Sequence, residues 1–340
     1  MSGPVTLSQV AREAGVSLAT ASRAFNGSAN RTVREDLRER VMAAAERLRY
    51  VPDANAQAMA RGRTSSLGLI VHDIADPYFS SIAAGVTIAA DRADLAVTLA
   101  NTQQDPSREA RFVEVLTSQR ARAIVIAGGR RDDVSDEQLT RALEGFRRAG
   151  GSLALIGQTL PGVNTVLIEN RKGSAALARV VHALGYRRFG VLAGPANYLT
   201  ARHRRAGFVD ELEKLGCAVR PDAIITSGFT REGGYEGMQT LLRDGPSVEI
   251  VFAVNDVMAV GAMAAAREAG VRVPEDIAVA GFDDIVTLRD VTPALTTVRV
   301  PLVEIGIAAT ELAIAAPSDE PQLIHMFGTV ILRESTTRRQ

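Results

Sequence analysis

The stretch TLSQVAREAGVSLATASRAF, residues 6–25, has the pattern of two short helices joined by a tight turn. Thr6 can cap a first helix, in which apolar residues recur at helical spacing. Gly15 then supplies a turn, and Ser17 is a suitable cap for a second helix over about residues 18–25. A helix–turn–helix of this spacing is typical of proteins that place the second helix in the major groove of DNA.

A third helix is predicted to start near Thr32, which forms a capping box with Glu35, and to run to Tyr50, because one apolar stripe runs along it and Pro52 stops it. Three helices with a small shared core make a head domain. Residues 1–63 hold ten arginines and six acidic residues, a net charge of +4, so the remaining 277 residues carry −4. A basic head on an acidic body fits a chain with one end facing DNA, although a surplus of four charges is modest.

From Leu67 onward, short apolar runs alternate with amphipathic stretches, which predicts an α/β body with parallel sheets flanked by helices. The rhythm repeats after about residue 163, which indicates two similar lobes. The predicted strands are LGLIVH, LAVTLAN, ARAIVIAG and GSLALIG, and then TVLIE, FGVLAG, AIITSG, IVFAVN and IAVAGFD. The predicted helices cover 77–93, 106–119, 135–149, 171–184, 201–215, 231–243 and 256–269. Ligands of such sheets bind beyond the carboxyl ends of the strands, so the cleft between the lobes is the expected ligand site.

The head stretch, extended to TLSQVAREAGVSLATASRAFNGS, and the later RERVMAAAERLRYVPDANAQAMARGRTSSLGLIV together resemble the head and hinge of the LacI/GalR family of repressors. The resemblance extends over nearly the whole chain. It implies an all-α three-helix head and a hinge helix, followed by a two-lobed body like that of periplasmic sugar-binding proteins. The implied domains are a DNA-binding head at 1–52, a hinge and linker at 53–66, and an effector-binding and dimerisation domain at 67–340. Within that domain, the first lobe covers about 67–162 and 298–332, and the second covers about 163–297.

The resemblance also implies which head residues meet DNA. Leu18, Ala19 and Arg23 would read base edges, and Arg23 alone on that helix can make a bidentate contact to guanine. The residues expected mostly to contact phosphates or fix the register are Thr6, Ser17, Thr20, Ser22 and Asn26. For Ser17 and Asn26 a helix-capping role is an equal alternative.

Residues 53–60 resemble the family's hinge helix, which lies in the minor groove as a pair, and the DNA contacts expected from it are Asn55, Ala56 and Met59. Met59 stands where the family usually has a leucine that wedges open a base step. The alternative is that Met59 packs against its dimer mate.

The body supplies candidate effector-binding residues at predicted strand ends: Tyr78, Phe79, Arg202, Phe229, Asn255 and Asp283. An arginine, an aspartate and an asparagine among aromatic faces suit a hydroxyl-rich ligand such as a sugar or a nucleoside. Other readings stay open. Arg202 and Asp283 can form a structural salt bridge, Phe79 can belong to the core, and Asp256 is expected to cap a helix.

Other classes of protein fit the sequence less well. The phosphate-loop, metalloprotease and nucleophile-elbow motifs are absent, and the four histidines show no metal-ligand spacing, so we expect no enzyme, no cofactor and no metal. An NAD-dependent enzyme would carry a glycine fingerprint after the first strand, where HDIADP stands. A solute-binding protein would explain the body but not the head. The sequence shows no signal peptide or membrane segment, so we expect a cytoplasmic protein. We also expect a homodimer, possibly a tetramer, that binds a near-palindromic operator in double-stranded DNA.

Overall fold

The computed structural model describes residues 5–26, 33–51, 64–132, 136–316 and 320–339. Its head consists of three helices, α1 (Leu7–Glu13), α2 (Leu18–Asn26) and α3 (Glu35–Leu48), as the sequence predicts. The helices share a small core that includes Val10, Ala21 and Val41, each fully buried. Helix α3 begins slightly later than predicted, with Arg34 as its N-cap residue.

The turn between α1 and α2 is built as the sequence indicates. Gly15 has a φ of +67°, a left-handed conformation that glycine adopts without strain. The Ser17 hydroxyl accepts a hydrogen bond from the Thr20 backbone N–H at 3.1 Å, so Ser17 caps α2. At the start of α1, the Gln9 side chain accepts from the Thr6 backbone N–H at 2.7 Å. These caps fix where α2 begins and therefore which of its residues face outward.

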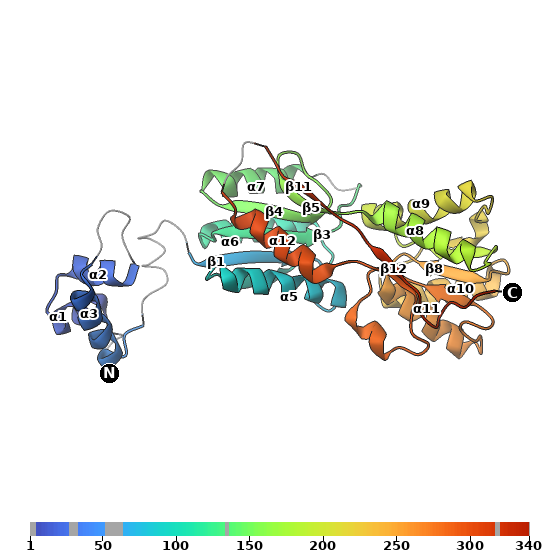
Figure 1. The fold of residues 1–340 in the computed structure, drawn as a ribbon. Helices are drawn as coiled ribbons and strands as arrows, with labels where there is room; N and C mark the ends of the chain where they lie inside the picture. The colour runs from blue at the N-terminus through green and yellow to red at the C-terminus, as the bar shows by residue number, and fades with distance from the viewer. Residues whose placement is uncertain (1–4, 27–32, 52–63, 133–135, 317–319, 340) are drawn as a thin grey trace. The chain divides into compact units, whose positions relative to one another are not determined.

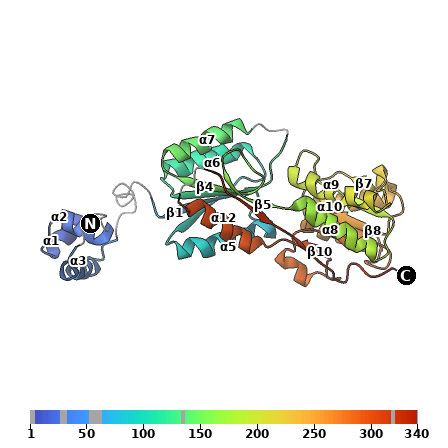
Figure 2. The same ribbon diagram turned by 45° about the horizontal axis from the view of Figure 1, so that its top comes forward.

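The first lobe of the body is a six-stranded parallel sheet in the order β11-β5-β4-β3-β1-β2. Figures 1 and 2 show α5 and α12 side by side on one face of this sheet, with α6 and α7 on the other. The strands are β1 (Ser66–Val71), β2 (Ala96–Asn101), β3 (Ala123–Gly128), β4 (Ser152–Gly157), β5 (Asn164–Ile168) and β11 (Leu323–Met326). The helices are α5 (Pro77–Arg92), α6 (Ser107–Ser118), α7 (Glu137–Arg148) and α12 (Leu302–Ile314).

The second lobe is a four-stranded parallel sheet in the order β7-β6-β8-β9. Helices α8 and α9 pack together, as do α10 and α11, and Figure 1 shows the two pairs on opposite sides of the sheet. The strands are β6 (Phe189–Leu192), β7 (Ile224–Ile225), β8 (Ile250–Ala253) and β9 (Ala278–Ala280). The helices are α8 (Asn170–Ala183), α9 (Leu199–Lys214), α10 (Arg231–Asp244) and α11 (Asp256–Glu268), and short 3₁₀ turns cover Pro221–Ala223 and Val286–Asp290.

The boundary between the lobes differs from the prediction. The segment TVLIE was expected to open the second lobe at about residue 163, but β5 pairs in parallel with β4 inside the first sheet. The chain crosses after β5, because the next helix, α8, packs on α9 of the second lobe. Strands β10 (Thr297–Arg299) and β12 (Thr329–Ile331) form a separate antiparallel pair at the return crossings. After β12 the chain returns to the second lobe, where the Val279 N–H donates to the Ser335 carbonyl at 3.1 Å.

Candidate DNA-reading face and ligand pocket

Helix α2 carries the three residues predicted to read base edges, Leu18, Ala19 and Arg23. Leu18 is 52% exposed, a high value for a large apolar side chain, and Ala19 is exposed beside it. Arg23 is half-buried, and its Nε donates to the Ala19 carbonyl at 2.9 Å. Ala21, which points away from Ala19 and Arg23, is fully buried in the head core. The exposed face therefore offers apolar contact and one guanidinium, the groups that base reading requires.

The structure describes only some of the other head residues predicted to contact DNA. Ser17 does cap α2, and its hydroxyl also lies 2.9 Å from that of Thr20. Thr6 is exposed at the start of α1, and Ser22 is half-buried in α2. The side chain of Asn26 and all of Asn55, Ala56 and Met59 lie outside the described residues.

The body holds a pocket at the carboxyl ends of strands from both sheets, where the sequence predicts the ligand site. The space in it that holds no atoms, open solvent included, is about 570 Å³. It is lined by His72, Asp73, Asp76, Tyr78, Phe79, Gln104, Gly129, Tyr198, Thr200, Arg204, Phe229, Asn255 and Asp283. Five of the six predicted effector residues are in this set.

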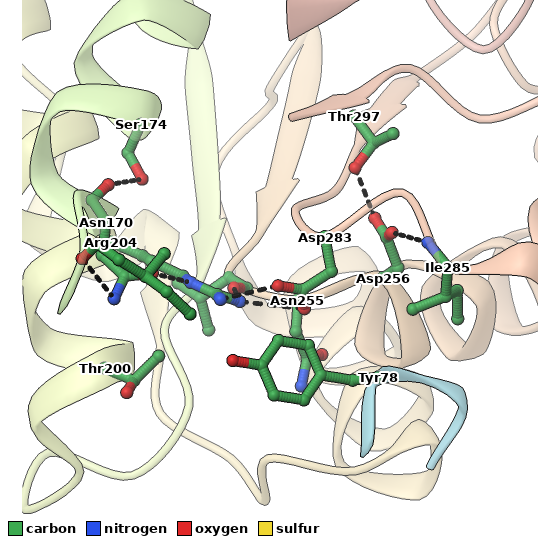
Figure 3. A network of polar contacts seen from close by, with 12 residues as sticks. Tyr78, Asn170, Ser174, Thr200, Arg204, Asn255, Asp256, Asp283, Ile285 and Thr297 are labelled. Carbon is green, nitrogen blue, oxygen red and sulfur yellow. Dashed lines mark hydrogen bonds and ion pairs between the residues drawn. The ribbon is translucent and has the colours of Figure 1, made fainter. Parts of the chain in front are cut away.

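The floor of the pocket is a buried ion pair between Arg204 of α9 and Asp283, which follows β9 (Figure 3). The Arg204 Nη2 and Nη1 atoms donate to the two Asp283 carboxylate oxygens at 2.6 and 3.0 Å. Arg204 also donates to the Asn170 side chain at 2.8 Å and to the Val254 carbonyl at 2.9 Å. Its guanidinium lies over the Phe282 ring, 4.0 Å from the centroid. These contacts hold the guanidinium in one orientation.

Asp283 itself is held in an uncommon backbone conformation, with a φ of +124°. Such a conformation costs on the order of 1–3 kcal/mol for a residue other than glycine and is found most often at functional sites. Two backbone hydrogen bonds hold it, one from the Asp283 N–H to Val298 at 2.9 Å and one from the Val300 N–H to Asp283 at 3.1 Å. Burial raises the pKa of the Asp283 carboxyl, and the guanidinium of Arg204 opposes that rise.

Aromatic rings form the walls. Tyr78 and Phe79 come from the first turn of α5, with centroids 4.9 Å apart and nearly perpendicular rings. Tyr198 and Phe229 lie stacked, with centroids 5.9 Å apart. Figure 3 shows Tyr78 beside the Arg204–Asp283 pair, although Tyr78 belongs to the first lobe and the pair to the second. Faces of this kind pack against sugar rings, while the polar floor fixes orientation.

The arginine predicted for this site is the wrong one. Arg202 does not line the pocket, and its side chain is 40% exposed and paired with Asp132 of the first lobe. Residues two positions apart on a helix point about 200° away from each other, so Arg202 and Arg204 cannot both face the floor. Ala201 and Phe208 of the same helix are fully buried, and Arg204 shares their face. That spacing was the signal in the sequence that identifies Arg204.

A second correction concerns the start of α11. Asp256 was expected to cap this helix, but Asn255 is the N-cap residue, and its side-chain oxygen accepts from the Met258 N–H at 2.9 Å. Asp256 is instead fully buried and accepts from the Thr297 hydroxyl at 2.6 Å and from the Ile285 N–H at 3.0 Å. Asn255 lines the pocket as predicted, and its amide nitrogen lies 3.5 Å from the Phe229 carbonyl.

The two lobes also contact each other beside the pocket. The Leu199 N–H donates to the Arg130 carbonyl at 3.0 Å, and the Asp132 N–H donates to the Asn197 carbonyl at 3.1 Å. The Gln158 amide donates to the Thr200 hydroxyl at 2.8 Å, and the Arg131 guanidinium lies 5.5 Å from the centre of the Tyr198 ring. A molecule in the pocket therefore sits next to the contacts that hold the lobes together.

Among the described residues, no helix combines the length and the apolar composition that spanning a membrane requires. The same residues bring together no group of three or more histidine, cysteine or acidic side chains suited to a metal ion.

Comparison with known proteins gives matches over the whole chain. A family model described as bacterial regulatory proteins, lacI family, matches residues 6–53, and one described as periplasmic binding proteins and sugar binding domain of LacI family matches residues 64–323. The HTH-type transcriptional regulator GalS of Salmonella typhimurium strain LT2 is 34% identical over 341 residues, which cover 99% of this chain and 98% of the relative. GalR of Escherichia coli K12 is 33% identical and covers 96% of this chain and 94% of its own.

Solved structures agree with these matches. The lac repressor dimer bound to operator and the anti-inducer ONPF superposes with a TM-score of 0.83 at 26% identity, covering 98% of this chain and 100% of the other. A complex of the transcriptional regulator CelR with cellobiose superposes with a TM-score of 0.72 at 28% identity, with the same coverage.

Proposed function

This chain belongs to the LacI family of bacterial regulatory proteins, and from that premise we propose that an uncharged sugar in the pocket between its lobes sets how tightly its head holds an operator. The chain is a DNA-binding transcriptional regulator of the repressor type, with a sugar-binding body. What the family does not give is the effector and the residues that hold it.

The observation that carries the proposal is the Arg204–Asp283 pair on the pocket floor. A guanidinium has five N–H groups, and four hydrogen bonds from Arg204 to Asn170, Val254 and Asp283 account for most of them. The Asp283 carboxylate retains acceptor capacity. The floor therefore offers acceptors and a remaining N–H donor to a ligand. Sugar hydroxyls both donate and accept, so they match this surface.

The charges around the pocket favour an uncharged ligand. Its lining includes the carboxyls of Asp73, Asp76 and Asp283, against the single guanidinium of Arg204, which Asp283 already neutralises. A phosphate group carries about −1.5 to −2 charges at neutral pH and would face these carboxyls without a free cation to receive it. We therefore expect the free sugar, and not its phosphate, to be the effector.

Binding is coupled to the DNA through the lobes. A ligand that contacts both walls favours the arrangement in which the lobes meet, because it binds that arrangement more tightly than one in which they are apart. A coupling of about 1–3 kcal/mol changes operator affinity about 5- to 150-fold. The hinge, residues 53–60, is the expected relay, and it lies outside the described residues. We assign ligand binding, and no catalysed reaction, to the pocket.

On the DNA side, we propose that Leu18, Ala19 and Arg23 read base edges. The proposed phosphate and register contacts are Thr6, Ser17, Thr20, Ser22 and Asn26, with Asn55, Ala56 and Met59 in the minor groove. One three-helix head covers too little DNA for tight specific binding, so we expect a homodimer with two heads on a near-palindromic operator. Because the protein acts on DNA, we propose that it works in the cytoplasm.

The test begins with selection of operators from a random duplex library by the full-length protein. We expect a near-palindromic consensus, and an Arg23→Ala variant that discriminates less at one base pair of each half-site. Affinity for the selected operator is then measured with D-galactose, D-glucose, D-ribose, cellobiose or adenosine, and with the 6- or 5-phosphates of the three monosaccharides. At least one free sugar should change the affinity 5-fold or more, and its phosphate should not. An effect of the phosphates alone would contradict the proposed effector class.

A further inference from the structure

The first-lobe wall of the pocket contains a second polar cluster, formed by His72, Glu109 and Arg130. His72 directly follows β1, Glu109 lies in α6, and Arg130 follows β3. The His72 Nε2 atom lies 3.0 Å from the Glu109 carboxylate, and the Arg130 Nη2 atom donates to both oxygens of the same carboxylate. Arg130 is held in turn by Asp136, 3.1 Å from its Nη1 atom. The cluster thus connects the ends of β1 and β3 with α6 behind the imidazole ring of His72.

The charged members of the cluster are buried behind the ring, away from water. Glu109 is 1% exposed, and the Arg130 side chain is 8% exposed. Burial alone would raise the pKa of Glu109, but the hydrogen bond from His72 and the charge of Arg130 outweigh it and lower that pKa. Glu109 is therefore a carboxylate at neutral pH, and a carboxylate can only accept. The Nε2 atom of His72 must then be the donor, which fixes where the ring carries a hydrogen.

The ring is also fixed by its neighbours. A Cβ atom on Gly128 would fall 2.2 Å from the His72 Nε2 atom, so only glycine at this position leaves room for the ring. The Phe79 ring lies on another side, with centroids 5.9 Å apart. His72 lines the pocket, and its second nitrogen, Nδ1, makes no hydrogen bond to any residue that the structure describes. The ring thus brings one unused polar atom to the pocket wall.

We propose that His72 is a ligand-contacting and specificity-determining residue of the first lobe, with Nδ1 hydrogen-bonded to a sugar hydroxyl and Glu109 and Arg130 as positioning residues. This assignment rests on the proposed function and adds a contact residue from the first lobe to it. The sugar is then held from both sides, by Arg204 and Asp283 in one lobe and by His72 in the other. With Nε2 held by Glu109, Nδ1 is the polar atom of the ring that remains for a sugar hydroxyl, which can donate or accept, so the contact selects for a hydroxyl at one position of the sugar.

The same cluster touches the other lobe. The Arg130 carbonyl accepts from the Leu199 N–H at 3.0 Å, and its own N–H donates to the Gln158 side chain at 2.8 Å. Arg130 therefore holds the partner of His72 with its side chain and the second lobe with its backbone. A sugar hydrogen-bonded to His72 therefore binds a part of the first lobe that already contacts the second lobe. Its binding can for this reason favour the arrangement in which the lobes meet.

The experiment compares full-length wild type with His72→Phe, which keeps a ring against Gly128 but loses the hydrogen bond. The matched control is His182→Phe, because His182 lies at the far end of α8, outside the pocket lining. D-galactose, D-glucose, D-ribose and cellobiose are titrated calorimetrically, and the tightest of them is followed by its monodeoxy analogues. We expect His72→Phe to bind that sugar about 10-fold more weakly. One monodeoxy analogue, which lacks the contacted hydroxyl, should bind wild type and variant equally.

A structural role for His72 would give a different pattern, with equal losses for the parent sugar and for every analogue. That pattern, or no loss at all, would overturn the proposal. Glu109→Gln should weaken binding of the same sugar by a smaller factor and spare the same analogue, because the His72 ring remains but the group that accepts its Nε2 hydrogen bond has lost its charge. Operator affinity without sugar checks that each variant is folded. If none of the four sugars binds wild type, the proposed function fails as well; if they bind and His72→Phe has no effect, only this assignment fails.

Discussion

Helix α9 carries two arginines that each pair with an aspartate in opposite surroundings. Arg204 and Asp283 have side chains 1% and 5% exposed, whereas Arg202 and Asp132 are 40% and 42% exposed. The buried pair has lost its water and attracts strongly in a medium of low dielectric constant, while the exposed pair is screened. The buried pair lies within one lobe, and the exposed pair joins the two. The comparison teaches that helix position, and not residue type, assigns one arginine to the floor and the other to the lobe contact.

The largest expected effect comes from breaking the buried pair. Arg204→Met leaves the Asp283 carboxyl buried without its partner, which we expect to lower the unfolding free energy of the body by about 3–5 kcal/mol. The response of operator binding to the active sugar should also be lost. Urea unfolding followed by circular dichroism measures the first effect, and operator titration with and without sugar measures the second. A cost below about 1 kcal/mol would mean that Asp283 does not depend on Arg204.

The double variant Arg204→Met with Asp283→Leu separates stability from recognition. Both charges are then absent, so no uncompensated carboxyl remains, and we expect most of the lost stability to return. The sugar response should stay absent, because the hydroxyl partners are gone. Recovery of the response would show that the sugar is held elsewhere.

The second prediction concerns Asp256, a buried carboxyl that forms no ion pair with an arginine among the described residues. Burial raises the pKa of Asp256 to about 6 in the folded chain, from an ordinary value of 3.8. Because the folded state holds this proton more tightly than the unfolded state, the contribution of Asp256 to stability is greatest below pH 4. It declines as the pH rises to about 6, and the change between pH 4.5 and 7.5 is about 2 kcal/mol.

Asp256→Asn tests this sign, because asparagine keeps an acceptor for the Thr297 hydroxyl and cannot ionise. The unfolding free energy of the variant, minus that of wild type, should rise by about 2 kcal/mol between pH 4.5 and 7.5. Asp244→Asn, at an exposed position of α10, should give a difference that does not change with pH in this way. A flat difference for Asp256→Asn would mean that Asp256 is as acidic in the folded chain as in the unfolded one.

Most of the architecture could be predicted because it depends on local patterns. The seven predicted body helices agree with α5 to α11 within about two residues at each end, since apolar periodicity and caps act over a few residues. The assignment of β5 to the second lobe was wrong for the same reason. Its apolar pattern says that it is a buried strand, but which sheet it joins depends on pairing with β4, which no local pattern records.

The residues of the candidate site could likewise be predicted only where they follow from a local pattern. Strand ends gave Tyr78, Phe229 and Asp283, because the carboxyl edge of a parallel sheet follows from the pattern. His72 also directly follows an apolar strand, but its spacing to the other histidines does not single it out. Its partners Glu109 and Arg130 are 21 residues apart and meet only in the folded lobe, so no spacing in the sequence joins them.

The smallest expected effect comes from the exposed pair. Arg202→Met removes a screened contact, so we expect the unfolding free energy to fall by at most about 1 kcal/mol, and by less at high salt. The sugar should still alter operator binding, because Arg202 does not line the pocket. The pair joins the lobes, however, so sugar affinity should fall slightly, by about 2- to 3-fold, as the arrangement with the lobes in contact becomes less favoured. Calorimetric titration of the active sugar at low and high salt measures this, since salt should abolish the difference between wild type and Arg202→Met. A loss as large as that of Arg204→Met would put Arg202 back at the ligand and remove the distinction between the two faces of α9.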